Sequence, residues 1–334
     1  MTLPSGGVPD TDAAAGPAAG ASGSRGSGWT KVLRRVFALA VVVGIVLVLW
    51  KQWDEVVRSL QAVSPWTLLT SLLVGMVATA VPALVWRDLL AVQGYRVGAL
   101  NTARTFFLAQ LGKYVPGGIW ALVAQVDLAR DLGVPARASA TATLLTLALS
   151  ILAGLLAAGL TLPLALPGLV VGYWWVFLLL PVLLIMLIPR VVSWWSDRIF
   201  RLMRRPGPTF QMTWGVVLRT TALQFASFGL FGLHFALLVQ QLGEGGPSLW
   251  LLSTGTFALG WIAGLLVVVA PAGAGVREGV LVLGFASLLP AAGVLTVALL
   301  SRLLLLVADV LLAAVSVGAA RLARRPGTGA TVGP

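Results

Sequence analysis

GKYVPGGIW, residues 112–120, interrupts a chain that is otherwise dominated by apolar residues. The stretch begins with a cation and a phenol, Lys113 and Tyr114. Three helix-breaking residues follow them: Pro116, Gly117 and Gly118. At bilayer depth an interrupted backbone has to be buried in protein or line a wet cavity, because lipid offers its amide groups no hydrogen-bond partners. The break therefore predicts a site inside a membrane protein.

A second break, PAGAGVRE at residues 271–278, has the same character. Gly273 and Gly275 interrupt the helix, and Arg277 with Glu278 begins the next one. In the last apolar run, Arg302 and Asp309 lie seven residues apart, on roughly the same helix face. They are expected to pair with each other or with groups elsewhere. Ionisable residues inside a membrane are functional candidates by default.

Composition supports the membrane assignment. Of the 334 residues 58% are hydrophobic and only 10% are charged, against about 25% charged in soluble domains. The apolar runs are long rather than alternating, which predicts helices. The formal net charge is +12, but the basic residues cluster at the ends of apolar runs, so they indicate topology and anionic headgroups rather than nucleic acid.

Several classes of catalytic and metal-binding site are excluded because the residues that they need are missing from the sequence. Cysteine is absent and His234 is the only histidine, which excludes thiolate catalysis, disulfides and His-rich or Cys-based metal sites. No phosphate-binding loop, dinucleotide glycine pattern or paired catalytic carboxylates are present. We expect no cofactor. His234, alone on an apolar span, is interpreted as an interhelical hydrogen-bonding residue.

The apolar runs predict an all-α membrane protein. Residues 1–28 are expected to form a disordered tail, 29–320 the transmembrane domain and 321–334 a basic tail. Full spans are predicted at residues 36–50, 66–86, 138–162, 169–188, 214–239, 249–270 and 291–317. The runs at 102–111 and 280–289 are too short to cross about 30 Å of hydrocarbon. We expect about eight crossings if the second broken segment spans and the first is re-entrant, with seven as the alternative.

Charge placement orients these spans. Basic residues precede residue 36, and residues 190–211 form a long, Arg-rich connection. Both indicate the cytoplasmic side. We therefore expect a multi-pass protein of the bacterial plasma membrane with a cytoplasmic N-terminus. Each half also contains a short helix, a Gly/Pro break with a cation, and further spans, which favours an internal repeat around a midplane site.

The same two breaks carry a resemblance to a known family. LGKYVPGGIW, followed by DLARDLGV at residues 127–134, resembles the membrane region of lysylphosphatidylglycerol synthetases and their stand-alone flippase-like relatives. APAGAGVREGVLV and the later SRLL around Arg302 are similar to that family's second signature. The resemblance covers roughly residues 30–320. Ala272 and Ala274 depart from the pattern, since the family tends to have Gly and an aliphatic residue there.

The resemblance implies a function for the membrane part alone. The synthetases carry aminoacyl transfer in a C-terminal soluble domain, which does not follow here, so we expect no lysyl transfer and no enzyme activity of that kind. What carries over is binding or movement of a lipid between leaflets. We expect Lys113 and Arg277 to hold a lipid phosphate, with Arg302 beside them, Tyr114 ordering the headgroup and Glu278 positioning Arg277.

The partners expected are an anionic phospholipid or a lipid-linked glycan in the membrane, and a second copy of the chain or a transferase subunit. Two alternative functions stay open. A membrane enzyme on a lipid-linked substrate would need Glu278 or Asp309 as its acid or base. A non-catalytic subunit of a membrane transferase would need neither.

Overall fold

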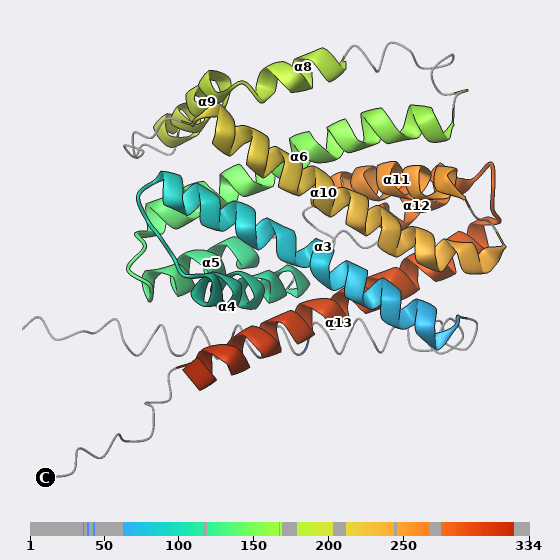
Figure 1. The fold of residues 1–334 in the computed structure, drawn as a ribbon, viewed down its shortest axis with the longest axis horizontal. Helices are drawn as coiled ribbons and strands as arrows, with labels where there is room; N and C mark the ends of the chain where they lie inside the picture. Colours follow the sequence, from blue (N-terminus) through green and yellow to red (C-terminus); the bar gives the residue numbers. More distant parts are fainter. Residues whose placement is uncertain are drawn as a thin grey trace, which may run out of the picture. The chain divides into compact units, whose positions relative to one another are not determined.

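The structure, a computed structural model, describes residues 63–115, 119–166, 179–202, 212–243, 246–266 and 275–323, with residues 36, 39, 43 and 168 (Figure 1). The chain divides into two units, Met1–Leu39 and Ala40–Pro334, and the fold below is that of the second. The predicted tail at 1–28, most of the span at 36–50 and the first half of the span at 169–188 lie outside the described residues. The number of crossings therefore stays a prediction.

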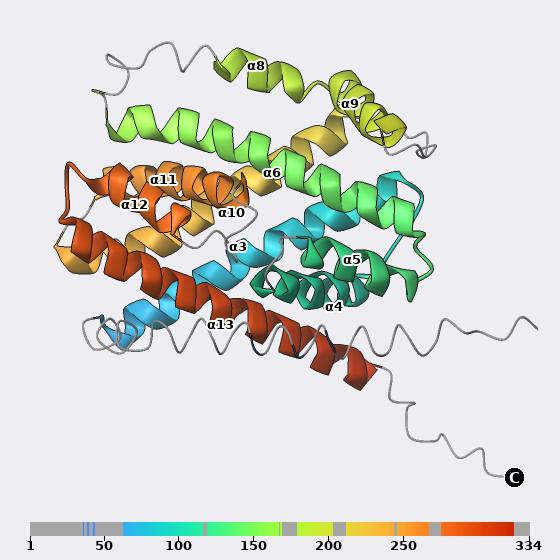
Figure 2. The same ribbon diagram turned by 180° about the vertical axis from the view of Figure 1, so that it is seen from behind.

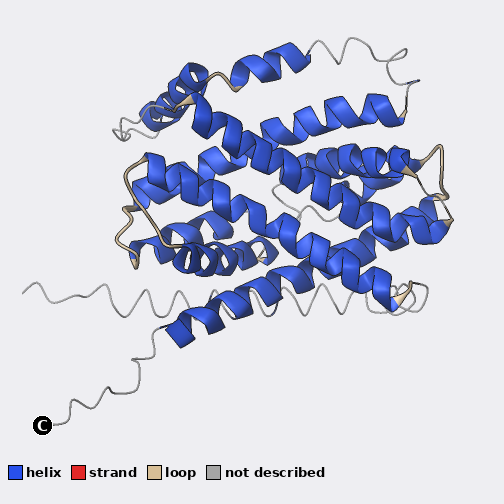
Figure 3. Cartoon of the chain, viewed as in Figure 1, coloured by secondary structure: helices blue, strands red, loops and turns tan. Residues whose placement is uncertain are grey.

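The described part of the chain is helical and contains no strand (Figure 3). Its α-helices are α3 (Pro65–Val92), α4 (Ala99–Gln110), α5 (Trp120–Arg130), α6 (Ala136–Ala165), α8 (Leu179–Met186), α9 (Pro189–Leu202), α10 (Trp214–Val239), α11 (Pro247–Leu266), α12 (Val276–Phe285) and α13 (Ala291–Ala323). Two short 3₁₀ helices, η1 (Leu111–Tyr114) and η3 (Gln240–Leu242), follow α4 and α10.

Five of these helices, α3, α6, α10, α11 and α13, are long and apolar enough to cross a membrane. Their outward faces are apolar as well. On α3, Trp66, Leu69, Leu73 and Val77 recur at helical spacing and are all exposed. A helix on the surface of a soluble protein places polar residues on that face. The arrangement confirms a helical, multi-pass membrane protein.

Polar side chains are found between the helices instead. The Ser227 hydroxyl on α10 donates to the Ala78 carbonyl on α3 at 2.8 Å. The Gln224 amide nitrogen donates to Ser150 Oγ on α6 at 2.6 Å. Such bonds help to hold membrane helices together, because the hydrophobic effect gives little drive for two apolar helices to associate when both are already surrounded by lipid tails.

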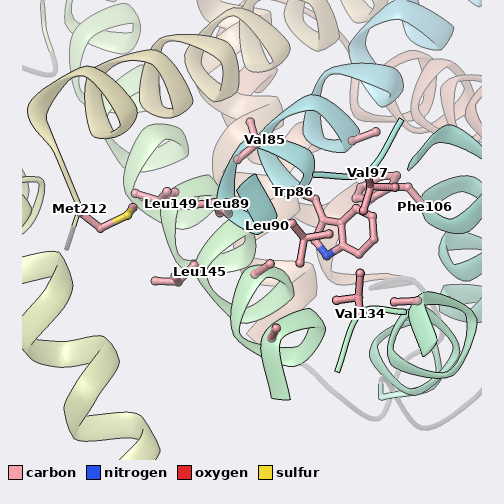
Figure 4. Packing of buried hydrophobic residues seen from close by; sticks show 14 of the residues in the cluster. Val85, Trp86, Leu89, Leu90, Val97, Phe106, Val134, Leu145, Leu149 and Met212 are labelled. Atoms are coloured by element: carbon pink, nitrogen blue, oxygen red, sulfur yellow. The ribbon is translucent and has the colours of Figure 1, made fainter. Parts of the chain in front are cut away.

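An apolar cluster anchors the first short helix to the bundle. Trp86 on α3 is fully buried, and its ring lies 6.4 Å from that of Phe106 on α4. Figure 4 shows Val97 and Val134, from the loops before α4 and after α5, close to the same indole. The cluster fixes where α4 and α5 enter the bundle.

The helices on either side of each break pack against each other as a helical hairpin. In the first, α4 packs on α5, and a Cβ on Gly112 would lie 2.7 Å from the Ala121 amide nitrogen. In the second, α11 packs on α12, and a Cβ on Gly260 would lie 3.3 Å from the Arg277 carbonyl oxygen. Glycine allows the two backbones to approach closely in both hairpins.

The packing partners repeat between the two halves. Helices α3, α4, α5 and α6 correspond in order to α10, α11, α12 and α13. When each helix is replaced by its counterpart, every main helix–helix contact becomes another contact that the structure also has. Thus α4 packs on α13 and α11 on α6, while α3 packs on α13 and α10 on α6. The equivalent helices α3 and α10 lie side by side and run in opposite directions (Figures 1 and 2). This is the arrangement of an inverted repeat, with a break in each half.

Several boundaries differ from those expected, and α13 continues to Ala323, into the predicted basic tail. Helix α3 continues to Val92, past its expected end at residue 86, and Arg87 Nε donates to the Val97 carbonyl at 3.1 Å. Helix α6 continues past Pro163 to Ala165. The Arg-rich connection contains α9 rather than a loop, because Pro189 begins a segment with apolar and basic residues at helical spacing.

Candidate functional site

The first break places two polar side chains on one carboxylate. Lys113 Nζ and the Tyr114 hydroxyl, both from η1, each lie 2.6 Å from Asp309 Oδ2 on α13. The Asp309 side chain is 1% exposed, whereas that of Lys113 is 36% exposed. Lys113 Nζ also lies 5.5 Å from the centroid of the Tyr114 ring. The ion pair thus joins a buried anion to a cation that remains accessible.

The second break forms a separate ion pair on the same helix. Arg302 Nη1, on α13, donates to Glu278 Oε1 at 2.9 Å. The other carboxylate oxygen, Glu278 Oε2, accepts the Gly275 amide at 2.7 Å. Gly275 has φ +86°, a left-handed conformation that favours glycine at the start of α12. Both oxygens of Glu278 are therefore bonded, and both side chains of the pair are at most 10% exposed.

Arg277 contacts an aromatic ring and interacts through its charge with members of both pairs. Its guanidinium carbon is 4.1 Å from the centroid of the Phe257 ring on α11, a cation–π contact. Its charge acts on Tyr114 and Asp309 of the first pair as well as on Glu278 and Arg302 of the second. The cation therefore belongs to the same charged cluster while it is held by an aromatic face.

The structure brings together the residues that the two sequence breaks singled out. Lys113 and Tyr114 come from one hairpin, Arg277 and Glu278 from the other, and α13 supplies the groups that bond to them. The cluster comprises Lys113, Tyr114, Arg277, Glu278, Arg302 and Asp309, and we call it the charged cluster. Pro116, Gly117, Gly118 and Gly273 lie outside the described residues.

The seven-residue spacing of Arg302 and Asp309 does not produce a pair between them. Each bonds to a different hairpin instead. Arg302 pairs with Glu278 of the second hairpin, and Asp309 pairs with Lys113 of the first. Of the two alternatives that the sequence left open, the structure therefore shows pairing with groups elsewhere. The bonds of the Glu278 carboxylate go to Arg302 and to the Gly275 amide, so Glu278 acts on Arg277 through its charge.

Three residues of the site were missed by sequence reasoning. Phe257 holds Arg277, Gly260 lets α12 approach α11, and Gly112 lets α5 approach η1. Phe257 and Gly260 are three residues apart, on one face of α11. Small residues before them, at 253–256, were a signal of close packing, but nothing in the sequence indicated which cation they would face.

His234 forms a polar contact next to the cluster. Its Nδ1 lies 2.9 Å from the Ser71 carbonyl on α3, and its Nε2 lies 2.8 Å from Ser301 Oγ on α13. A carbonyl oxygen can only accept, so Nδ1 carries the proton and, in the neutral ring, Nε2 accepts from the Ser301 hydroxyl. The structure supports the prediction that His234 is an interhelical hydrogen-bonding residue, and its partner Ser301 directly precedes Arg302 in the chain.

The charged cluster suits an anion better than a metal. Three cations face two carboxylates, which leaves one positive charge in excess: Lys113, Arg277 and Arg302 against Glu278 and Asp309. Among the described residues, no three His, Asp or Glu side chains lie close enough together to hold a metal ion. An excess cation with an accessible ammonium group can bind a phosphate.

Fold and site together define a class: multi-pass helical membrane proteins with an ion-paired site at two broken helices. Residues 36–313 match the family described as Lysylphosphatidylglycerol synthase TM region, and the chain belongs to that family. This confirms the resemblance carried by the two breaks. The chain is thus a membrane protein related to lipid modification or transport. No curated protein matches the chain.

Proposed function

We propose that this protein binds an anionic phospholipid or lipid-linked substrate and moves it between the leaflets of the bacterial plasma membrane. The N-terminus then lies in the cytoplasm, as the basic flanks of the spans favour. What supports the proposal is that Lys113, from one hairpin, is ion-paired with Asp309 on α13, and that Arg277, from the other hairpin, interacts through its charge with Asp309 and Arg302 on the same helix. Two cations on separate hairpins can hold one phosphate while the hairpins move relative to each other.

The state of the two carboxylates supports binding over catalysis. Glu278 has both oxygens bonded, to Arg302 and to the Gly275 amide. Asp309 Oδ2 is shared by Lys113 and Tyr114. A general acid or base needs an oxygen within hydrogen-bond reach of the substrate, and both oxygens of Glu278 already accept a hydrogen bond from the protein. A positioning role for Glu278 fits these contacts.

Removal of either cation should abolish most lipid movement. We expect Lys113→Ala and Arg277→Ala each to slow the transfer of acyl-labelled phosphatidylglycerol in proteoliposomes by about tenfold or more, because a hydrogen bond to a charged group contributes about 1.5–3 kcal/mol. The rate is measured by the accessibility of the label to a membrane-impermeant quencher.

Arg219→Ala is the matched control. Arg219 also pairs with a carboxylate, Asp88, at 2.8 Å, but its side chain is 67% exposed and lies outside the charged cluster. Its variant should transfer lipid at close to the rate of the unmodified protein. Full activity of both Lys113→Ala and Arg277→Ala, at normal expression, would contradict the proposal.

A further inference from the structure

The two carboxylates of the charged cluster differ in how completely they are bonded. Glu278 uses both oxygens. Asp309 uses only Oδ2, and its Oδ1 is buried with no hydrogen-bond partner among the described residues. A buried carboxylate oxygen without a partner is costly. Lys113 and the Tyr114 hydroxyl are therefore the direct partners of the Asp309 carboxylate.

The Lys113 ammonium group has two roles that compete with each other. It is the direct cationic partner of Asp309, and it is the accessible cation of the proposed lipid site. When a lipid phosphate draws Lys113 away, Asp309 keeps only the Tyr114 bond and becomes a buried anion without its ion-pair partner. Such a group neutralises by taking up a proton rather than staying charged.

We propose that lipid binding is coupled to protonation of Asp309, so that the protein moves one proton together with each monoanionic headgroup. This rests on the function proposed above and adds the ion to which movement is linked. Before binding, the Lys113 ammonium and the Asp309 carboxylate neutralise each other. After binding, the ammonium neutralises the phosphate, and the proton resides on a carboxyl oxygen of Asp309. The charge of the site is the same in both states.

Other titratable groups around Asp309 are already engaged. From α12, Arg277 acts on Asp309 through its charge and is held by Phe257. Glu278, also on α12, is bonded to Arg302. On α3, Arg87 bonds to a carbonyl and Asp88 pairs with Arg219 of α10. His234 on α10 is bonded at both nitrogens. The remaining group on a helix that packs on α13 is the half-buried Arg104 of α4. Within the charged cluster, Asp309 is the carboxylate with an oxygen that has no hydrogen-bond partner among the described residues.

The coupling has a measurable consequence. Binding that takes up one proton strengthens by about tenfold for each pH unit of acidification, as long as the free site is ionised and the occupied site is protonated. We expect this dependence for acyl-labelled phosphatidylglycerol bound to the full-length protein in phosphatidylcholine nanodiscs, between about pH 8 and about pH 6. The phosphodiester stays anionic over this range, so the ligand itself does not titrate.

Asp309→Asn tests the residue. An amide cannot ionise, so Lys113 is free at every pH. Binding should then lose its pH dependence, and at about pH 8 it should be about fivefold tighter or more than in the unmodified protein, the lower end of usual coupling between linked sites. Asp88→Asn, which removes another ion-paired aspartate outside the cluster, should keep the full dependence.

A measurement on the unmodified protein covers the case in which Asp309→Asn does not fold. In weakly buffered solution, addition of lipid should remove close to one proton from solution per lipid bound, and an imposed pH gradient should accelerate transfer in proteoliposomes. Binding that does not depend on pH, or a pH dependence that persists in Asp309→Asn, would overturn the proton coupling. If lipid is still transferred in that case, the proposed function stands. An absence of lipid binding and transfer at every pH would overturn both.

The source of the phosphate is tested in the same assay. Soluble glycerol phosphate presents the same anion without acyl chains. It should compete weakly with the labelled lipid, because the site is reached from the bilayer. Competition at concentrations similar to those of the lipid, without lipid transfer, would show a site for a free phosphate ester and overturn the coupling to lipid.

Discussion

Replacing Glu278 by Met should lower the stability of the protein by about 3–5 kcal/mol, because it removes the carboxylate that pairs with the buried guanidinium of Arg302. The pair is at most 10% exposed, and Glu278 also accepts the Gly275 amide. The substitution conserves approximate volume, so the cost reports the lost charge and hydrogen bonds. It is measured by titration with sodium dodecyl sulfate in mixed micelles.

Two further variants separate a buried ion pair from a general effect of charge. The double variant Glu278→Met with Arg302→Met should recover most of the loss, because a buried pair replaced by apolar groups is often neutral in stability. Asp88→Met removes the partner of Arg219, whose side chain is 67% exposed, and should cost less than about 1 kcal/mol. Equal costs for Glu278→Met and Asp88→Met would show that the Glu278 pair is not shielded from water.

Gly112→Ala should displace the first half of the site. A Cβ at this position would lie 2.7 Å from the Ala121 amide nitrogen and 2.8 Å from the Trp120 carbonyl carbon. These are backbone atoms and cannot rotate away, so η1 and α5 must separate. Overpacking of this kind costs about 1–3 kcal/mol. The neighbouring Lys113 and Tyr114 would move from Asp309, and a displacement of about 1 Å can reduce a rate by about a hundredfold.

The measurement is lipid transfer together with stability in mixed micelles. Gly318→Ala, on α13, is the control, since a Cβ there meets no atom within 4 Å. It should leave transfer unchanged and leave stability equal or higher by about 0.5–1 kcal/mol. If Gly112→Ala were as stable and active as Gly318→Ala, the hairpin would be looser than the structure describes.

Helices and breaks could be predicted from the sequence because they depend on local composition. Apolar runs of at least about twenty residues cannot remain in water, and Pro, Gly and a cation within a few positions end a helix wherever it lies. The helix expected at residues 66–86 continues to Val92, because the charges of Arg87 and Asp88 end the apolar run in the sequence but do not end the helix. The structure keeps them helical by bonding Arg87 to the Val97 carbonyl and Asp88 to Arg219.

The pairing of charges could not be predicted in the same way. Asp309 lies 195 residues from Tyr114 in the chain, and Arg302 lies 24 residues from Glu278. Helical spacing places Arg302 and Asp309 on one face but does not say which hairpin reaches each of them. That choice depends on where α4 and α12 cross α13, which is set by packing along the whole length of the helices.

The sequence by itself determined the membrane class, the family, the two broken segments and the ionisable residues that belong to them. The reason is that transfer of apolar surface and loss of backbone hydrogen bonds are properties of short stretches of chain. Only the tertiary structure decided that Lys113 and Tyr114 share Asp309, that Arg302 holds Glu278, and that Phe257 holds Arg277. A buried charge takes the partner that helix packing brings within about 3 Å, and that partner need not be near in the sequence.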